Sequence, residues 1–397
     1  MERKVSLRRY DLDWLRVIAI LAVFFFHNGR FFDTGGWHVK NPVTNPGADY
    51  FTGFLGSWIM PLIFVISGAS LFYGLGKGGF GRFLKDKVLR LLVPLVVGAF
   101  THASLMVYLE RRTQGGFSGS YFEFLPHYFE GFYAFGGNFA WMGLHLWYLE
   151  ILFLFSLIFY PLFRWFKMGS GQRLLNGLGN LLAKPGAVAL LAVPGTILYA
   201  TLNPRGYAGL RDFGGWPLPV YFFYLLAGFQ IIAHAGLQDS IKRQRWFALG
   251  AVLVTFVTTI VANISGGADA PFGSLPNMLA QASYSLLSWS ILLALLGFGF
   301  QRLTFSNSFL KYANEAVLPF YIMHQTVILG LGYFVVQTDL PAWLKYAITS
   351  VSSFIVIMGL YELLVRRWNV LRVLFGMKPL QKTVAVKTPQ AVGNKPA

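Results

Sequence analysis

The chain has 397 residues, of which 55% are hydrophobic and 12% are charged, whereas soluble globular domains carry about 25% charged residues. This composition excludes a soluble globular fold and predicts an integral membrane protein. The formal net charge is +17 and cysteine is absent, which excludes disulfides, thiolate nucleophiles and cysteine-ligated metals.

Apolar segments recur along almost the whole chain, each close to the roughly 20 residues that cross the hydrocarbon. They predict an all-α integral membrane protein built as a bundle of about ten transmembrane helices. The expected spans are 12–32, 50–75, 89–109, 144–166, 185–202, 217–235, 246–264, 283–300, 314–336 and 344–365. Pro185, Pro194 and Gly195 interrupt the fifth segment, so it either crosses with a kink or returns to the same face.

The predicted spans divide the connecting segments into two sets, one on each side of the membrane, and most of the basic residues fall in one of them. Only seven of the 33 Lys and Arg residues fall in the other set: Arg30, Lys40, Arg111, Arg112, Arg205, Arg211 and Lys345. By the positive-inside rule this set faces outward, and both termini are cytoplasmic. The positive charge therefore reflects membrane topology and does not indicate nucleic-acid binding. Residues 1–377 are expected to form one transmembrane domain, and residues 378–397 a disordered basic cytoplasmic tail.

The first span carries two residues that a helix in lipid should resist, Arg16 and His27. Eleven residues make about three helical turns and a rise of roughly 16 Å, so both side chains lie on one stripe. Asp13, three residues before Arg16, can pair with it on the same face. Ionisable residues in the hydrocarbon are costly and by default mark a functional site.

With the amino terminus inside, the other intramembrane titratable residues also acquire a depth. His102, His145 and His324 fall in the outer half of the membrane with His27, and Glu150 lies one to two turns below His145. The inner face carries the basic run Arg82, Lys85, Lys87 and Arg90 before the third span. This arrangement predicts phosphate-binding chemistry inside and proton chemistry outside. His102 and His324 each also fit a structural hydrogen bond between helices, His145 also fits an interfacial residue beside Trp147 and Tyr148, and the basic run also fits a membrane anchor.

Four segments resemble signatures of the acyltransferase family 3 membrane proteins, in family order. YDLDWLRVIAILAVFFFH resembles the opening motif with Arg16 and His27, and MPLIFVISGASLFY the second-span motif around Ser67 and Gly68. HLWYLEIL resembles the motif with His145, Trp147 and Tyr148, and PFYIMHQTVI the later pattern with Tyr321 and His324. The carboxyl-terminal layout is most similar to the stand-alone branch that includes glucan succinyltransferases. Lys87 stands where some members carry the first Arg of an Arg-x-x-Arg motif, and Lys lacks the bidentate fork of guanidinium.

The resemblance implies an O-acyltransferase in the cell membrane, with acetyl-CoA or succinyl-CoA as donor and an extracytoplasmic glycan hydroxyl as acceptor. Arg16, Arg82, Lys87 and Arg90 are then candidates to bind the donor phosphates, and His27 is the candidate general base, with Glu150 or His324 orienting it or holding the acceptor. The further site candidates are Asp13, Ser67, His102, His145, Trp147 and Tyr321. The sequence contains no His-x-x-x-His or similar ligand spacing, so no metal site is expected.

Two other classes of protein fit the same intramembrane residues. A transporter of a glycan or a lipid-linked intermediate could use the histidines and Glu150 as a proton relay. A scaffold or channel-like protein would need no chemistry from them. Within the enzyme hypothesis, His27 could also carry the acyl group itself instead of acting as a base.

Overall fold

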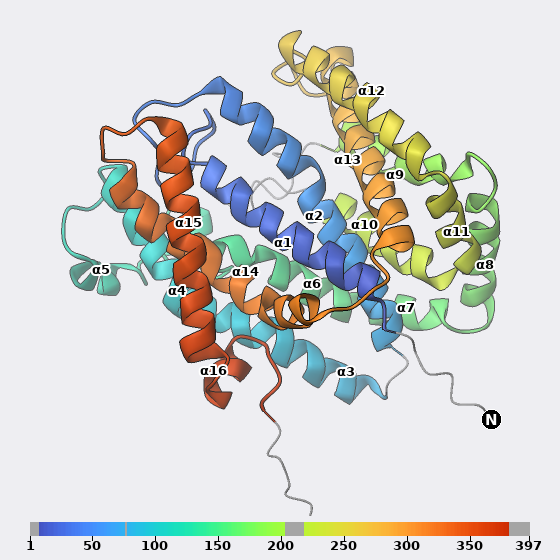
Figure 1. The fold of residues 1–397 in the computed structure, drawn as a ribbon, viewed down its shortest axis with the longest axis horizontal. Helices are drawn as coiled ribbons and strands as arrows, with labels where there is room; N and C mark the ends of the chain where they lie inside the picture. The colour runs from blue at the N-terminus through green and yellow to red at the C-terminus, as the bar shows by residue number, and fades with distance from the viewer. Residues whose placement is uncertain (1–7, 76–77, 203–217, 381–397) are drawn as a thin grey trace, which may run out of the picture.

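The computed structural model describes residues 8–75, 78–202 and 218–380, and these residues form a helical bundle (Figure 1). The expected tail lies mostly outside the described residues. The long apolar helices are α1 (Tyr10–Gly29), α2 (Pro46–Gly74), α3 (Phe80–Lys87) continuing into α4 (Val93–Thr113), α12 (Arg245–Ile264), α13 (Leu275–Arg302), α14 (Ser308–Val335) and α15 (Ala342–Leu360). The shorter helices are α5 (Tyr121–His127), α6 (Trp147–Ile158), α7 (Tyr160–Phe166), α8 (Gly169–Leu182), α9 (Ala192–Thr201), α10 (Leu218–Ala233), α11 (Ala235–Arg243) and α16 (Asn369–Leu374).

The described residues contain seven helices that are long and apolar enough to cross a membrane, or up to nine if each of two bent pairs is one span. The bent pairs are α6 with α7, at 62°, and α10 with α11, at 101°. The multi-pass membrane architecture predicted from composition is therefore confirmed. The segment 185–202, expected as the fifth span, forms a five-residue 3-10 helix, Ala187–Leu191, that leads into α9, and the apolar helical segment Ala187–Thr201 is too short to meet the same criterion.

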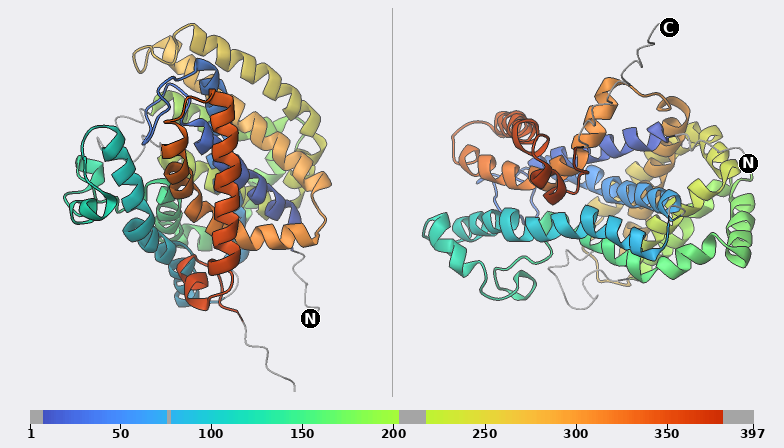
Figure 2. Two further views of the ribbon diagram at one scale, coloured as in Figure 1. Left: turned by 60° about the vertical axis from the view of Figure 1, so that its left-hand side comes forward. Right: turned by 90° about the horizontal axis from the view of Figure 1, so that it is seen from below.

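Helix α1 is central, with α2, α13 and α14 packed around it (Figure 1). At the margin, only 11% of the apolar window of α12 is buried (Figures 1 and 2). An apolar helix with so little protein around it is expected to face lipid. Helices α3 and α4 run as one long rod along the edge of the molecule (Figure 2, right). A π-helical turn, Val88–Leu92, joins them and carries Arg90.

Glycines let α2 and α10 approach until their backbones touch. A Cβ on Gly68 would lie 1.9 Å from the carbonyl oxygen of Leu225, and one on Gly228 would lie 1.9 Å from that of Val65. Small residues at crossings are the usual means of close packing between membrane helices. The glycine of the second-span motif, Gly68, is therefore explained by the close packing of these two helices.

Candidate functional site

Helices α1 and α14 bring two of the expected histidines into direct contact. His27 is in the last turn of α1, and His324 is past the middle of α14. The Nδ1 atom of His27 lies 2.9 Å from the Nε2 atom of His324, and the ring centroids are 4.9 Å apart. His324 is 1% exposed, whereas His27 is only half-buried. The pair therefore has one member inside the protein and one at its accessible edge.

The surrounding acceptors determine which nitrogens carry protons in the neutral rings. The Nδ1 atom of His324 lies 2.5 Å from the backbone carbonyl oxygen of Tyr321, which can only accept, so this nitrogen is the N–H donor. The Nε2 atom of neutral His324 is then an acceptor, and the Nδ1–H of His27 donates to it. It follows that the Nε2 atom of neutral His27 has a free lone pair and can act as a base.

A third histidine, His145, lies beside the pair. Its ring meets that of His324 edge-on at 5.0 Å, and its Nε2–H donates to the carbonyl oxygen of Ile322 at 2.9 Å. The hydroxyl of Tyr321 donates in turn to the carbonyl oxygen of His145 at 2.5 Å. His145 follows two left-handed residues, Gly143 at φ 69° and Leu144 at φ 53°. A leucine in that conformation is strained, and such strain clusters at functional sites.

A cavity of about 470 Å³, here called the central cavity, extends from Tyr321, which contacts His324, to the basic end of the bundle. Tyr321, Tyr148 and Ser67 line it, and the Tyr321 ring also stacks on that of His324 at 5.5 Å. The Ser67 hydroxyl donates to the carbonyl oxygen of Ile63 at 2.7 Å, so the Tyr148 hydroxyl donates to Ser67 at 2.6 Å. Apolar side chains, among them Ile66, line the walls between the two ends.

Basic side chains line the opposite end of the central cavity. Arg16, Lys87 and Arg90 line both the central cavity and a second one of about 470 Å³, here called the mouth cavity, whose lining also includes Arg82. Arg16 donates to Asp13 at 3.3 Å, to Asn314 at 3.2 Å and to Ser70 at 3.3 Å. The four basic residues expected to bind phosphate thus line two adjoining cavities that share wall residues.

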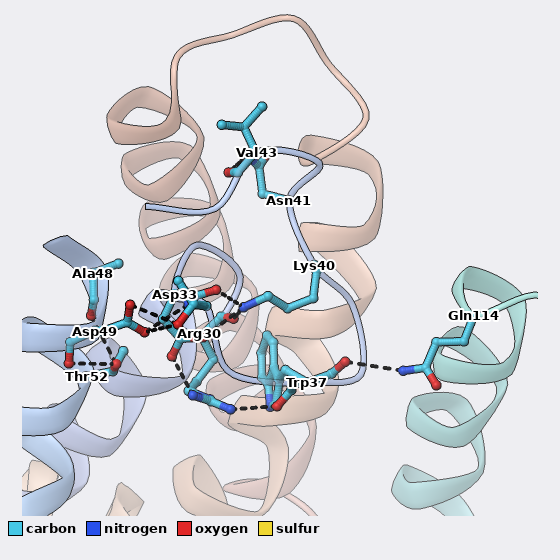
Figure 3. A network of polar contacts seen from close by, with 12 residues as sticks. Arg30, Asp33, Trp37, Lys40, Asn41, Val43, Ala48, Asp49, Thr52 and Gln114 are labelled. Atoms are coloured by element: carbon cyan, nitrogen blue, oxygen red, sulfur yellow. Dashed lines mark hydrogen bonds and ion pairs between the residues drawn. The ribbon is translucent and has the colours of Figure 1, made fainter. Parts of the chain in front are cut away.

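The loop after α1 lies against His27. Trp37 lies parallel to the His27 ring, with the centroids 6.2 Å apart and 14° between the planes. Buried Asp33 holds the loop: it accepts from Arg30 at 2.5 Å and from Lys40 at 2.8 Å (Figure 3). Gln114, at the end of α4, donates to the carbonyl oxygen of Trp37 at 3.4 Å (Figure 3).

Three expected site residues lie apart from this cluster. Glu150 is buried, but among the described residues no hydrogen bond joins it to either histidine of the pair. His102 bonds to neighbouring Thr101 at 2.8 Å, and its ring contacts Phe375 at 5.7 Å. Trp147 packs against Phe64 and Tyr221.

Sequence reasoning missed several residues of the site: Trp37, Asn314 and Arg372 were not singled out, and Tyr148 entered only as part of a motif. Trp37 lies in an irregular loop with no periodic signal, and only its contact with His27 reveals it. Asn314 is one polar residue at the start of an apolar span. Arg372 sits among the basic residues of the carboxyl-terminal region, and its burial is visible only in the fold.

Comparisons with known proteins agree with this architecture. A family model described as an acyltransferase domain matches residues 9–362. The chain is 22% identical over 387 residues to "Glucans biosynthesis protein C" of Salmonella schwarzengrund (strain CVM19633), covering 94% of this chain and 95% of that protein. The protein of the same name from Salmonella paratyphi B (strain ATCC BAA-1250 / SPB7) is 22% identical over 398 residues, with the same coverage. No solved structure matches. The resemblance found in the sequence motifs is confirmed.

Proposed function

This chain belongs to acyltransferase family 3, and from that premise we propose that it is a membrane-embedded O-acyltransferase of the cell inner membrane. It moves an acetyl or succinyl group from cytoplasmic acyl-CoA to a hydroxyl of an extracytoplasmic glycan. The relatives named for glucan biosynthesis support a glycan acceptor.

The observation that carries the proposal is the hydrogen bond between His27 and His324. It keeps the ring proton of neutral His27 on Nδ1, so the Nε2 atom is unprotonated. The carbonyl oxygen of Tyr321 fixes His324, and His324 fixes His27, in the way that a catalytic histidine is oriented by a third group. Two successive hydrogen bonds thus orient the base.

In the proposed reaction, the Nε2 atom of His27 takes the proton of the acceptor hydroxyl while that oxygen attacks the thioester carbonyl carbon. The C–S bond then breaks, and the CoA thiolate takes the proton from His27, so the products are an ester and free CoA. His27 carries the proton between these steps, and its Nδ1–H bond to His324 stabilises the charged ring. General base catalysis of this kind contributes about 10²–10⁴-fold to the rate.

The two cavities support a donor route. The mouth cavity offers Arg16, Arg82, Lys87 and Arg90 to the phosphates of the nucleotide. The apolar walls of the central cavity suit an extended pantetheine arm. The acyl end would then reach the layer of Ser67, Tyr148 and Tyr321, next to the histidine pair.

The first test measures release of free CoA thiol by the purified protein. With acetyl-CoA or succinyl-CoA we expect release that depends on an added glucan acceptor, and mass spectrometry should find the ester on that acceptor. A transporter would release no thiol with any donor and acceptor, and that outcome would refute the enzyme assignment.

The second test concerns the base. His27→Ala should lower the turnover rate about 10²–10⁴-fold while the protein still binds acyl-CoA. His127→Ala, an exposed histidine of the outer segment, is the matched control and should retain full turnover. A folded His27→Ala protein with full transfer rate would remove His27 from the chemistry. Incubation with donor alone separates base catalysis from an acyl-histidine intermediate, because only the latter leaves acylated protein.

A further inference from the structure

A short segment beyond the last long helix forms part of the wall of both cavities. This carboxyl-terminal strap, residues 369–378, consists of α16 and the turn that follows it. Arg372, Gly376, Met377 and Lys378 line the central cavity, and Lys378 also lines the mouth cavity. The strap therefore lies where the two cavities meet, opposite Arg16 and Lys87.

Arg372 anchors the strap from inside the protein, since it is only 6% exposed. Its Nη2 atom donates to Glu315 of α14 at 2.8 Å, and its Nη1 atom donates to the carbonyl oxygen of Arg366 at 3.0 Å. The Nε atom donates to the carbonyl oxygen of Lys378 at 2.8 Å. One side chain thus connects the strap to α14 and fixes the backbone of Lys378.

Gly376 seats the strap against the basic run. Its φ is 70°, and a Cβ there would lie 2.8 Å from the Leu318 side chain and 3.0 Å from the carbonyl oxygen of Arg90. Met377 N–H donates to the carbonyl oxygen of Arg372 at 2.7 Å, closing the turn. Glycine is suited to this position because it adopts the left-handed conformation and leaves room for Arg90.

The basic residues that line the two cavities differ in their pairing. Arg16 pairs with Asp13, Arg90 with Asp86, and Arg372 with Glu315. In the part of the chain that the structure describes, Lys378 makes no ion pair with a carboxylate, and neither do Arg82 and Lys87. A fixed backbone thus carries an uncompensated cation at the junction of the two cavities.

We infer that the strap is a wall of the donor site, in which Lys378 binds a phosphate of the donor nucleotide and Arg372 is the residue that positions it. The inference rests on the proposed function, because it assigns the phosphate chemistry of this junction to acyl-CoA. An anionic lipid headgroup offers the same chemistry, and the experiment separates the two sources.

The experiment compares two donors, acyl-CoA and acyl-pantetheine, which lacks the nucleotide phosphates. Lys378→Ala should raise the KM for acyl-CoA about fivefold with little change in kcat, and should leave acyl-pantetheine kinetics unchanged. Arg372→Gln should raise the same KM, and Arg372→Lys should restore part of it. Lys311→Ala is the control, an exposed lysine near the start of α14 that lines neither cavity.

Three outcomes would overturn the inference. The first is an unchanged KM for acyl-CoA in Lys378→Ala, and the second is an equal change with both donors, which would indicate a structural role. The third is an effect that appears only in nanodiscs containing phosphatidylglycerol, which would assign Lys378 to lipid. If the wild-type protein binds no acyl-CoA at all in a direct binding assay, the proposed function itself fails, and the inference fails with it.

Discussion

The Nε2 atom of His324 accepts from the Nδ1–H of His27 and so helps to orient that ring. His324→Ala removes that acceptor and lets the His27 ring rotate or change tautomer. We expect kcat to fall about 10- to 100-fold, less than in His27→Ala, because such orienting partners typically contribute that much. His324→Gln should recover part of the loss, since its amide oxygen can accept the same N–H. Steady-state kinetics with unchanged donor binding checks this, and a His324→Ala loss as large as that of His27→Ala would instead assign His324 to the chemistry.

For individual residues, the sequence predicted that Arg16 and His27 lie on one face of a helix, but it did not predict which side chains contact them. Arg16 and His27 share one helix face because the helical period is local and can be counted. The partner of His27 lies 297 positions away, and only the packing of α14 against α1 selects His324 over His102 or Glu150. Trp37 was missed for the same reason, since an irregular loop has no period to count.

At the scale of helices, the close contact of α2 with α10 predicts that a larger residue at the crossing lowers stability. Gly68→Ala places a methyl group 1.9 Å from the carbonyl oxygen of Leu225, so the two helices must separate. We expect a loss of about 3 kcal/mol or more, seen as lower thermal stability of the detergent-solubilised protein. Gly53→Ala, on the same helix with no atom within 4 Å of the added methyl group, should change stability by less than about 1 kcal/mol. Equal stability of the two variants would contradict the backbone contact between these helices.

The loop after α1 depends on one buried carboxylate. Asp33→Asn leaves the charges of Arg30 and Lys40 without their partner, so we expect a loss of about 3 kcal/mol in the free energy of unfolding. Turnover should also fall, because Trp37 is held over His27 by the same loop. The control is Asp239→Asn, whose half-exposed pair with Lys242 should contribute less than about 1 kcal/mol. Thermal melting and kinetics of both variants test this, and an Asp33→Asn protein as stable as the control would show that the buried charge is dispensable.

For the whole molecule, the two ends of the described chain lie together, since Arg8 and Lys378 line one cavity. Ends on the same side require an even number of crossings. If both bent pairs cross, the described helices make nine crossings, which is odd, so we expect the segment 185–202, which contains α9, to make a tenth.

The absence of cysteine makes this topology easy to test by labelling single cysteines. With a membrane-impermeant maleimide on intact cells, Thr201→Cys and Ser118→Cys should react. Lys184→Cys and Lys311→Cys should react only after the inner membrane is permeabilised. Labelling of positions 184 and 201 from the same side would show that this segment returns to the face it entered from.

The sequence by itself determined the membrane class, most of the spanning segments and the family. These follow from composition, local apolar runs and motifs within single helices, which need no knowledge of distant contacts. The tertiary structure decided which ionisable residues meet: His27 with His324, Trp37 over His27, and Arg372 holding the strap beside the basic residues. Such contacts join residues from distant parts of the chain, and they depend on how long helices cross and pack, which no local pattern encodes.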